Sequence, residues 1–165
     1  VVGFTTHTAD MNPASVVILL EEIFRTLDRV CEENGVTKIK TIGDSYMCFR
    51  GDADAATNAL SVARVSTEVM QTTFTWPDGS RILFRAGMHI GPATAGVIGT
   101  QRLQYDVWGD TVNVASRMES TGEPGRVHVS SCIAEALRSE RDFNLVPRGE
   151  VDIKGKGLMA TYWLE

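Results

Sequence analysis

The stretch Tyr105-Asp-Val-Trp-Gly-Asp-Thr-Val-Asn-Val-Ala-Ser-Arg-Met-Glu119 is the most informative part of the chain. It predicts the end of a strand, a Gly-Asp turn and then a helix, with Asp110 at the N-cap position. On that helix Asn113 and Arg117 are four residues apart, so their side chains project from one face. An amide and a guanidinium on one face suit a phosphate-bearing ligand, because arginine offers a rigid fork of donors. The alternative interpretation is an ordinary surface helix with a solvated arginine, because such a helix shows the same spacing.

A second segment, Lys38-Ile-Lys-Thr-Ile-Gly-Asp-Ser-Tyr-Met-Cys-Phe49, predicts two short strands joined by a tight Gly43-Asp44 turn. Asp44 is either a turn residue or a carboxylate that holds a hard cation such as Mg²⁺ or Mn²⁺. Lys40 is either a solvated strand lysine or a donor to a ligand ring nitrogen. Asp106, on the strand side of the Gly-Asp turn, is placed to reach a different part of the ligand from Asn113.

The rest of the chain alternates between helical and strand patterns. A helix is expected from Asn12-Pro13 to Asn34-Gly35, because asparagine caps helices well and proline suits their first position. Its expected apolar face comprises Val16, Val17, Leu20, Phe24, Leu27 and Cys31. Further elements are expected as a helix from Asp54 to about Thr73, a strand over 81–90, a short helix over 131–138, and closing strands near Val151 and over 161–164. The order β-α-β-β-α-β predicts an α+β, ferredoxin-like sandwich with C-terminal additions.

Composition narrows the function classes. With 165 residues and 43% hydrophobic content, the chain is expected to form one domain over residues 1–165. The net charge of −5 and the scarcity of strand aromatics argue against a nucleic-acid partner, including an RNA-binding sandwich. The sequence contains no apolar run long enough to predict a membrane-spanning segment. Cys31, Cys48 and Cys132 show no disulfide pattern, which favours a reduced, cytoplasmic setting for this segment and is compatible with a membrane-anchored parent protein.

Taken together and in order, the motifs of this chain resemble the catalytic domain of class III nucleotidyl cyclases, the adenylyl and guanylyl cyclase family. The resemblance covers nearly the whole chain. It is carried by Val1-Val-Gly-Phe-Thr5, the Lys38 to Tyr46 segment, Gly87-Met-His-Ile-Gly-Pro-Ala-Thr-Ala-Gly96, the Tyr105 to Glu119 block and Arg148-Gly-Glu-Val-Asp-Ile-Lys-Gly-Lys-Gly157.

The resemblance implies a role for each matching residue. Asn113 corresponds to the asparagine that orients the ribose, and Arg117 to the arginine that stabilises the transition state at the α-phosphate. Lys154 corresponds to the lysine that contacts the terminal phosphates. The backbone of Gly3-Phe4-Thr5 would hold the triphosphate where the first strand turns into the first helix, as N–H groups near a helix start bind anions.

The resemblance also implies two Mg²⁺ or Mn²⁺ ions as cofactors. Asp44 corresponds to the second of two metal-binding aspartates, and the backbone carbonyl of Val1 is an expected further ligand. The first aspartate belongs to an Asp-x-x-Gly-Phe-Thr pattern, so it would directly precede Val1 and is absent from the sequence. A second departure is Pro92, where some family members carry an arginine near the phosphates; Arg85 and Lys156 are the candidates to compensate.

Base selection in this family points to ATP. One position selects ATP when it is lysine and GTP when it is glutamate, and here it is Lys40. Its partner position selects ATP when it is aspartate and GTP when it is usually cysteine, and here it is Asp106. The resemblance therefore implies an adenylyl cyclase that works as a head-to-tail homodimer with shared active sites. The alternatives are a guanylyl cyclase and a catalytically inactive, nucleotide-binding regulatory domain.

Overall fold

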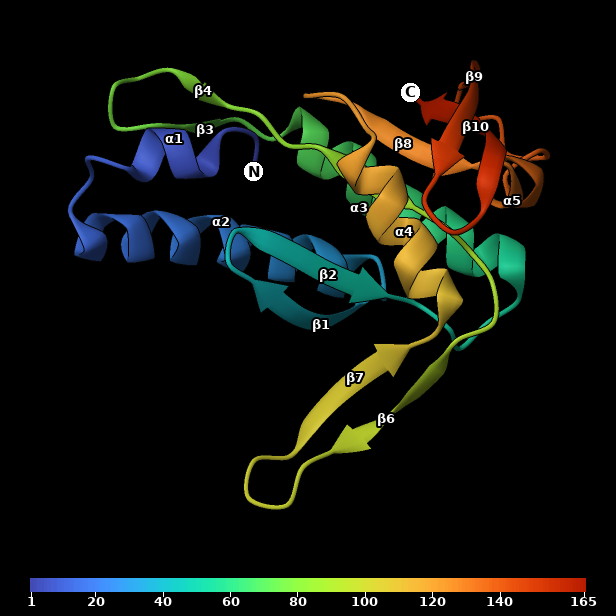
Figure 1. Cartoon of the computed structure of the whole chain (residues 1–165), viewed down its shortest axis with the longest axis horizontal. Coiled ribbons are helices and arrows are strands. Elements are labelled where there is room, and N and C mark those ends of the chain that lie inside the picture. Colours follow the sequence, from blue (N-terminus) through green and yellow to red (C-terminus); the bar gives the residue numbers. More distant parts are fainter.

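The computed structural model describes residues 1–165 (Figure 1). The helices are α1 (Phe4–Thr8), α2 (Pro13–Glu33), α3 (Ala55–Gln71), α4 (Asp110–Ser120) and α5 (Ser131–Ala136). The strands are β1 (Thr37–Ile42), β2 (Ser45–Phe49), β3 (Phe74–Thr75), β4 (Arg81–Ile82), β5 (Ala86–Met88), β6 (Thr94–Ile98), β7 (Gln104–Trp108), β8 (Val127–Ser130), β9 (Leu145–Ile153) and β10 (Gly157–Leu164). The predicted α+β class is confirmed, and the strands form four separate sheets.

Helix α2 begins as predicted, with the Asn12 side chain accepting a hydrogen bond from the Ala14 N–H at 2.9 Å. Its expected apolar face is only partly correct. Val17 is 64% exposed, whereas Ile23 and Val30, which were not on that face, are fully buried. All the buried residues of α2 lie between Ile23 and Cys31, because only the C-terminal half of the helix enters the core.

The β1–β2 hairpin is confirmed, and its turn needs Gly43. Ile42 pairs with Ser45, which leaves a two-residue turn, and Gly43 has a φ of 60° that favours glycine. The pairing register shifts at Ile39, so the ladder runs from Lys38 directly to Lys40. Such a bulge re-aims the side chains beside it. The two lysines, which would share a face in a regular strand, point to different partners.

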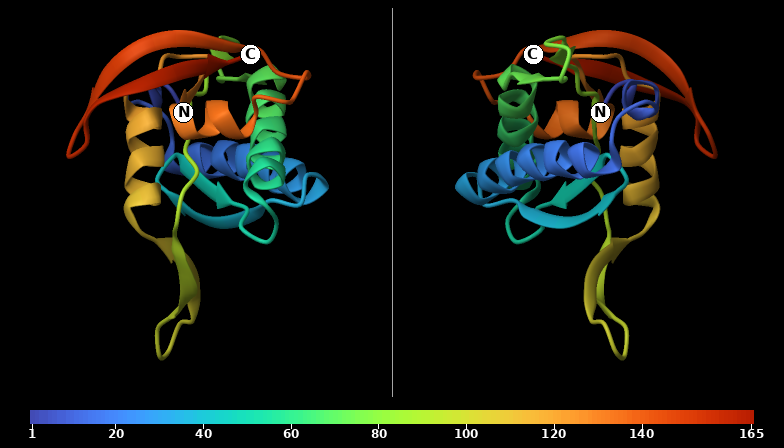
Figure 2. Two further views of the ribbon diagram at one scale, coloured as in Figure 1. Left: turned by 90° about the vertical axis from the view of Figure 1, so that its right-hand side faces the viewer. Right: turned by 90° about the vertical axis from the view of Figure 1, so that its left-hand side faces the viewer.

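The main sheet has the strand order β5-β8-β10-β9, in which β5 and β8 are parallel and the other pairs antiparallel. The strand expected over 81–90 is divided into β4 and β5. The division arises because β4 pairs with β3 in a separate hairpin, whereas β5 pairs with β8. Figure 2 shows β9 and β10 arching over one end of the molecule, with α3 and α4 below them on opposite sides.

Helix α4 packs unusually close to β5. A Cβ at Gly87 would lie 2.0 Å from the backbone nitrogen of Glu119, so only glycine fits there. Val114 and Met118 of α4 form a small core with Ile153 of β9. The expected N-cap is wrong by one residue: Gly109, with a φ of 132°, is the cap, and Asp110 is the first helical residue. The Asp110 carboxylate instead pairs with Lys156 at 2.5 Å.

The β6–β7 hairpin projects from the rest of the fold as an arm (Figure 1). Large apolar side chains on this arm are exposed, namely Val97, Ile98, Leu103 and Tyr105. An exposed apolar surface of this kind is characteristic of an interaction site.

The cysteines and the helices bear on the setting inferred from composition. All three cysteines are free, with Cys31 buried, Cys48 half-buried and Cys132 exposed. None of the helices combines the length and the apolar character that crossing a membrane would require.

Candidate active site

The two residues expected to select the base lie in contact. Lys40 on β1 and Asp106 on β7 form an ion pair with 2.5 Å between Nζ and Oδ2. Their side chains are 28% and 13% exposed, so the pair is sheltered from solvent. The hydrogen bond from Lys40 lowers the pKa of Asp106, as does the Val107 N–H, which donates to Oδ1 at 2.8 Å. The pair therefore offers one cationic donor and one ionised acceptor side by side.

Three further predicted residues meet in a single pocket of about 380 Å³ between α4 and the β9–β10 turn. Asn113 and Arg117 enter it from α4, and Lys154 from the turn. The lining residues are Asp110, Asn113, Val114, Arg117, Ile153, Lys154, Gly155 and Lys156. Val114 of α4 and Ile153 of β9 pack together in the small core beneath the pocket, which fixes α4 relative to the β9–β10 turn. The pocket therefore presents an amide and several cations in fixed positions.

Of the two candidates to compensate for Pro92, only Lys156 lies in the pocket with Arg117 and Lys154. Lys156 lines the pocket and pairs with Asp110. Arg85 does not line it and is held by Glu119, with 2.8 Å from Nε and 2.7 Å from Nη2 to Oε1. Sequence reasoning named both as candidates and missed the role of Asp110. The spacing Lys-Gly-Lys in a tight turn is the signal that could have favoured Lys156.

Asp44 lies apart from that pocket, at the tip of the β1–β2 hairpin. Its Oδ2 is 3.1 Å from the backbone nitrogen of Val1, so the two residues expected to hold metal are adjacent. No group of three or more His, Cys, Asp or Glu side chains is placed to hold a metal ion. Mg²⁺ is commonly bound by one or two carboxylates plus substrate phosphates, and the half-exposed Asp44 fits the role of one such carboxylate.

The backbone expected to bind phosphate, Gly3-Phe4-Thr5, closely follows Val1, which lies beside Asp44. Gly3, with a φ of 67°, is the N-cap of α1, and the Val2 N–H donates to the Leu83 carbonyl at 2.8 Å. Trp76 packs against α1, since its ring stacks on His7 with 4.4 Å between ring centres. The first N–H groups of a helix lack partners within it, which leaves those of Phe4 and Thr5 available to an anion.

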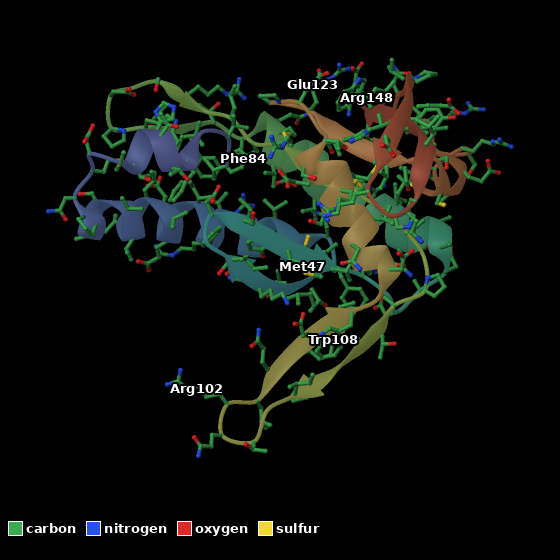
Figure 3. All side chains as sticks on the ribbon, in the orientation of Figure 1. Met47, Phe84, Arg102, Trp108, Glu123 and Arg148 are labelled. Atoms are coloured by element: carbon green, nitrogen blue, oxygen red, sulfur yellow. The ribbon has the colours of Figure 1, made fainter.

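A second pocket of about 330 Å³ adjoins Asp106 on the β6–β7 arm. It is lined by Ile98, Gly99, Arg102, Gln104, Asp106 and Trp108. Figure 3 shows Trp108 at the base of the arm and Arg102 near its tip. Sequence reasoning did not single out either of them, because no local pattern distinguishes a pocket-lining residue from the other residues of a hairpin.

Comparison with known proteins identifies the class of this domain. The profile of the adenylate and guanylate cyclase catalytic domain matches residues 1–165, and the chain belongs to this family. It is 42% identical to the receptor-type guanylate cyclase gcy-13 of Caenorhabditis elegans over 99% of its length. It spans 17% of that relative, so the domain corresponds to about a sixth of such a protein.

Solved structures agree with this assignment. The guanylate cyclase domain of RhGC from Catenaria anguillulae in complex with GTP superimposes with a TM-score of 0.91 at 30% identity, covering 99% of this chain and 91% of that one. The catalytic core of a rhodopsin-guanylyl cyclase with converted specificity, in complex with ATPalphaS, gives a TM-score of 0.89 at 32% identity, with 99% and 89% coverage. The predicted cyclase family and fold are therefore confirmed.

Proposed function

We propose that residues 1–165 form a single catalytic domain of an adenylyl cyclase, which converts ATP to 3′,5′-cyclic AMP and pyrophosphate. The observation that carries this choice of substrate is the Lys40–Asp106 pair. Adenine presents an acceptor at N1 and a donor amine at N6, so it is matched by one donor and one acceptor. Guanine presents the reverse at the same positions, and a buried polar group left unpaired costs about 1–3 kcal/mol.

Guanylyl cyclase activity is the second candidate. The names of the relatives favour it, because gcy-13 and the Catenaria domain are both guanylate cyclases. Against this stands the chemistry of Lys40 and Asp106 in this chain. The converted-specificity relative, which holds ATPalphaS, indicates that this fold accommodates an adenine nucleotide.

The reaction proposed is an in-line attack of the ribose 3′-hydroxyl on the α-phosphorus, with pyrophosphate leaving. Asn113 orients the ribose, and Arg117 stabilises the charge that develops on the α-phosphate oxygens. Lys154 holds the terminal phosphates in the same pocket. Because nucleophile and leaving group belong to one flexible molecule, much of the rate enhancement comes from holding them in line.

Two divalent ions, Mg²⁺ or Mn²⁺, are proposed as cofactors. Asp44 would hold them together with the Val1 carbonyl and a carboxylate directly before Val1, a position that the 3.1 Å contact between Val1 and Asp44 brings close. When bound, such ions lower the pKa of the attacking hydroxyl and neutralise the phosphates. The Gly3-Phe4-Thr5 backbone would contact the triphosphate beside them.

A homodimer with two shared sites is proposed as the active form. Asp44 does not line the pocket of Asn113, Arg117 and Lys154, so a partner's Asp44 side would complete that pocket. The apolar side chains on the β6–β7 arm, together with Ile42, provide surface for a second copy. We also propose a cytoplasmic setting, which the three free thiols suit. An inactive nucleotide-binding domain is the remaining alternative.

The test is to incubate the domain, produced with its native flanking residues, with ATP or GTP and Mn²⁺, and to quantify both cyclic nucleotides. Cyclic AMP that disappears in Asp44→Ala and in Arg117→Ala supports the proposal. As a matched control, Arg64→Gln removes an arginine that pairs with Asp142 at 3.8 Å on the surface, and it should leave turnover unchanged. Cyclic GMP alone would favour the second candidate, and no product from a confirmed dimer would favour the inactive one.

A further inference from the structure

We propose that His128 and Arg148 are positioning residues that fix the C-terminal turn of α4 and thereby set the place of Arg117. The proposal rests on the proposed function, since it is the role of Arg117 that gives the placement a consequence. His128 on β8 is 0% exposed, and Arg148 extends from β9 (Figure 3). Neither residue lines the pocket, so any effect on the reaction must pass through another side chain.

His128 holds the residue next to Arg117. Its Nδ1 is 2.7 Å from the Met118 carbonyl, and because a carbonyl only accepts, Nδ1 carries the hydrogen. The Met118 carbonyl belongs to the last turn of α4, where carbonyls lack partners within the helix. The imidazole N–H therefore satisfies the Met118 carbonyl in place of a backbone group.

Arg148 holds the same turn from a second side. Its Nη1 donates to the Thr121 carbonyl at 2.6 Å, and Thr121 in turn donates through Oγ1 to the Arg117 carbonyl at 2.7 Å. Nη1 also lies 3.2 Å from Nε2 and 3.3 Å from Nδ1 of His128. These nearly equal distances place the guanidinium over the imidazole ring. A cation at the C-terminal end of a helix is favourable, and after burial this one also lowers the pKa of His128.

A buried indole keeps Arg148 in place. The guanidinium carbon of Arg148 lies 4.5 Å from the ring centre of Trp163, and that of Arg126 lies 4.2 Å from it. The ring of His128 also packs there, with 5.0 Å between ring centres. Arg126 is itself fixed by Glu165 at 2.6 Å. The guanidinium of Arg148 is thus confined between Trp163, His128 and the end of α4.

Gly87 completes the constraint from β5. With the helix backbone seated directly on Gly87, α4 cannot move towards the sheet, and His128 and Arg148 prevent its last turn from moving away or rotating. Arg117 enters the pocket one residue before Met118. A displacement of about 1 Å in a catalytic group is enough to lower a rate by about 10²-fold, so the position of this turn matters for the reaction.

The test is a double-mutant cycle between His128 and Arg117 in the dimeric domain with its native flanking residues. His128→Leu should lower kcat about tenfold or more while the KM for the nucleotide changes less than about twofold. His128→Asn should restore most of kcat, since its amide N–H can donate to the Met118 carbonyl. In an Arg117→Lys background, His128→Leu should cost less than about a further twofold, because the group it positions is already changed.

The control is Ile133→Val, a buried change in the separate core cluster around Met88, which should leave kcat unchanged. Amide hydrogen exchange of residues 117–122, measured without substrate, should become faster in His128→Leu and stay unchanged in His128→Asn. Multiplicative losses in the cycle, or unchanged exchange, would overturn the proposal. If His128→Leu does not fold, Arg148→Lys replaces it in the cycle. A wild-type dimer that makes no cyclic nucleotide contradicts the proposed function, and the exchange experiment then decides on the placement of the turn alone.

Discussion

The pocket beside α4 and the tip of the β1–β2 hairpin differ in how many of the expected site residues they bring together. The α4 pocket combines Asn113, Arg117 and Lys154 on one packed base. At the hairpin tip Asp44 lies beside Val1, and it does not line the α4 pocket. Under the proposed function these two regions bind different parts of one substrate, and a second copy of the chain would bring them together.

The largest expected effect comes from separating the two regions onto different chains. Asp44→Ala and Arg117→Ala should each abolish turnover, with losses of about 10³-fold or more. Mixed in equal amounts and allowed to exchange subunits, the two inactive variants should recover about a quarter of wild-type activity, because half of the dimers carry one intact site. Cyclic AMP formation before and after mixing measures this. A mixture that stays inactive while forming mixed dimers would show that each site is built within one chain.

The next effect concerns the base. Lys40→Glu combined with Asp106→Cys should lower the ratio of kcat/KM for ATP to that for GTP by about 10²-fold, because the donor and acceptor positions are reversed. Lys38→Glu is a matched control: it lies on the other side of the Ile39 bulge and pairs with Asp28 at 2.8 Å, so it should leave the ratio unchanged. An unchanged ratio in the double variant would remove Lys40 and Asp106 from base selection.

A smaller effect is expected at the rim of the α4 pocket. Lys156→Gln removes a pocket-lining cation and leaves Asp110 unneutralised beside the phosphates. We expect the KM for the nucleotide to rise about threefold to tenfold, and Asp110→Asn in the same variant to reverse part of the rise. Inhibition by inorganic tripolyphosphate should weaken in parallel. Equal KM values in Lys156→Gln and wild type would assign this lysine to the surface ion pair alone.

The smallest effect is on stability in mildly acidic solution. Burial lowers the pKa of both His89 and His128 and outweighs the opposing effects of Asp110 on His89 and of the Met118 carbonyl on His128. The folded state therefore binds protons less readily than the unfolded chain, whose histidines take up protons below about pH 6.5. The free energy of unfolding should fall as pH decreases from about 7 to 5, by at most about 1.4 kcal/mol per pH unit for each histidine.

Denaturant titrations at several pH values test this expectation. His128→Asn should show a shallower decrease than wild type, since one of the two protonation sites is removed. An identical slope in His128→Asn would mean that His128 has the same pKa in the folded and unfolded states.

Local signals predicted the elements, and tertiary contacts decided the remainder. The Asn12 cap, the helix start at Asp54 and the Gly43-Asp44 turn depend on a few neighbouring residues, and each is found within one residue of its predicted place. The bulge at Ile39 and the division of residues 81–90 depend on which strand pairs with which, so no local pattern revealed them.

In the candidate site, too, some features follow from local spacing and others from tertiary contacts. Asn113 and Arg117 share a helix face by spacing alone, and the structure places both in one pocket. Lys40 and Asp106 are 66 residues apart, and only the family resemblance linked them before the structure showed their contact. No sequence pattern indicated the contacts of His128 and Arg148 with the end of α4, because a buried histidine cannot be told from other polar residues in an apolar strand.

The central claim, that Lys40 and Asp106 select adenine, is tested most directly by the steady-state kcat/KM of the wild-type dimer for ATP and for GTP under one set of conditions. The account predicts a kcat/KM for ATP at least about tenfold above that for GTP, with cyclic AMP as the product. A higher kcat/KM for GTP, with cyclic GMP as the product, would contradict it.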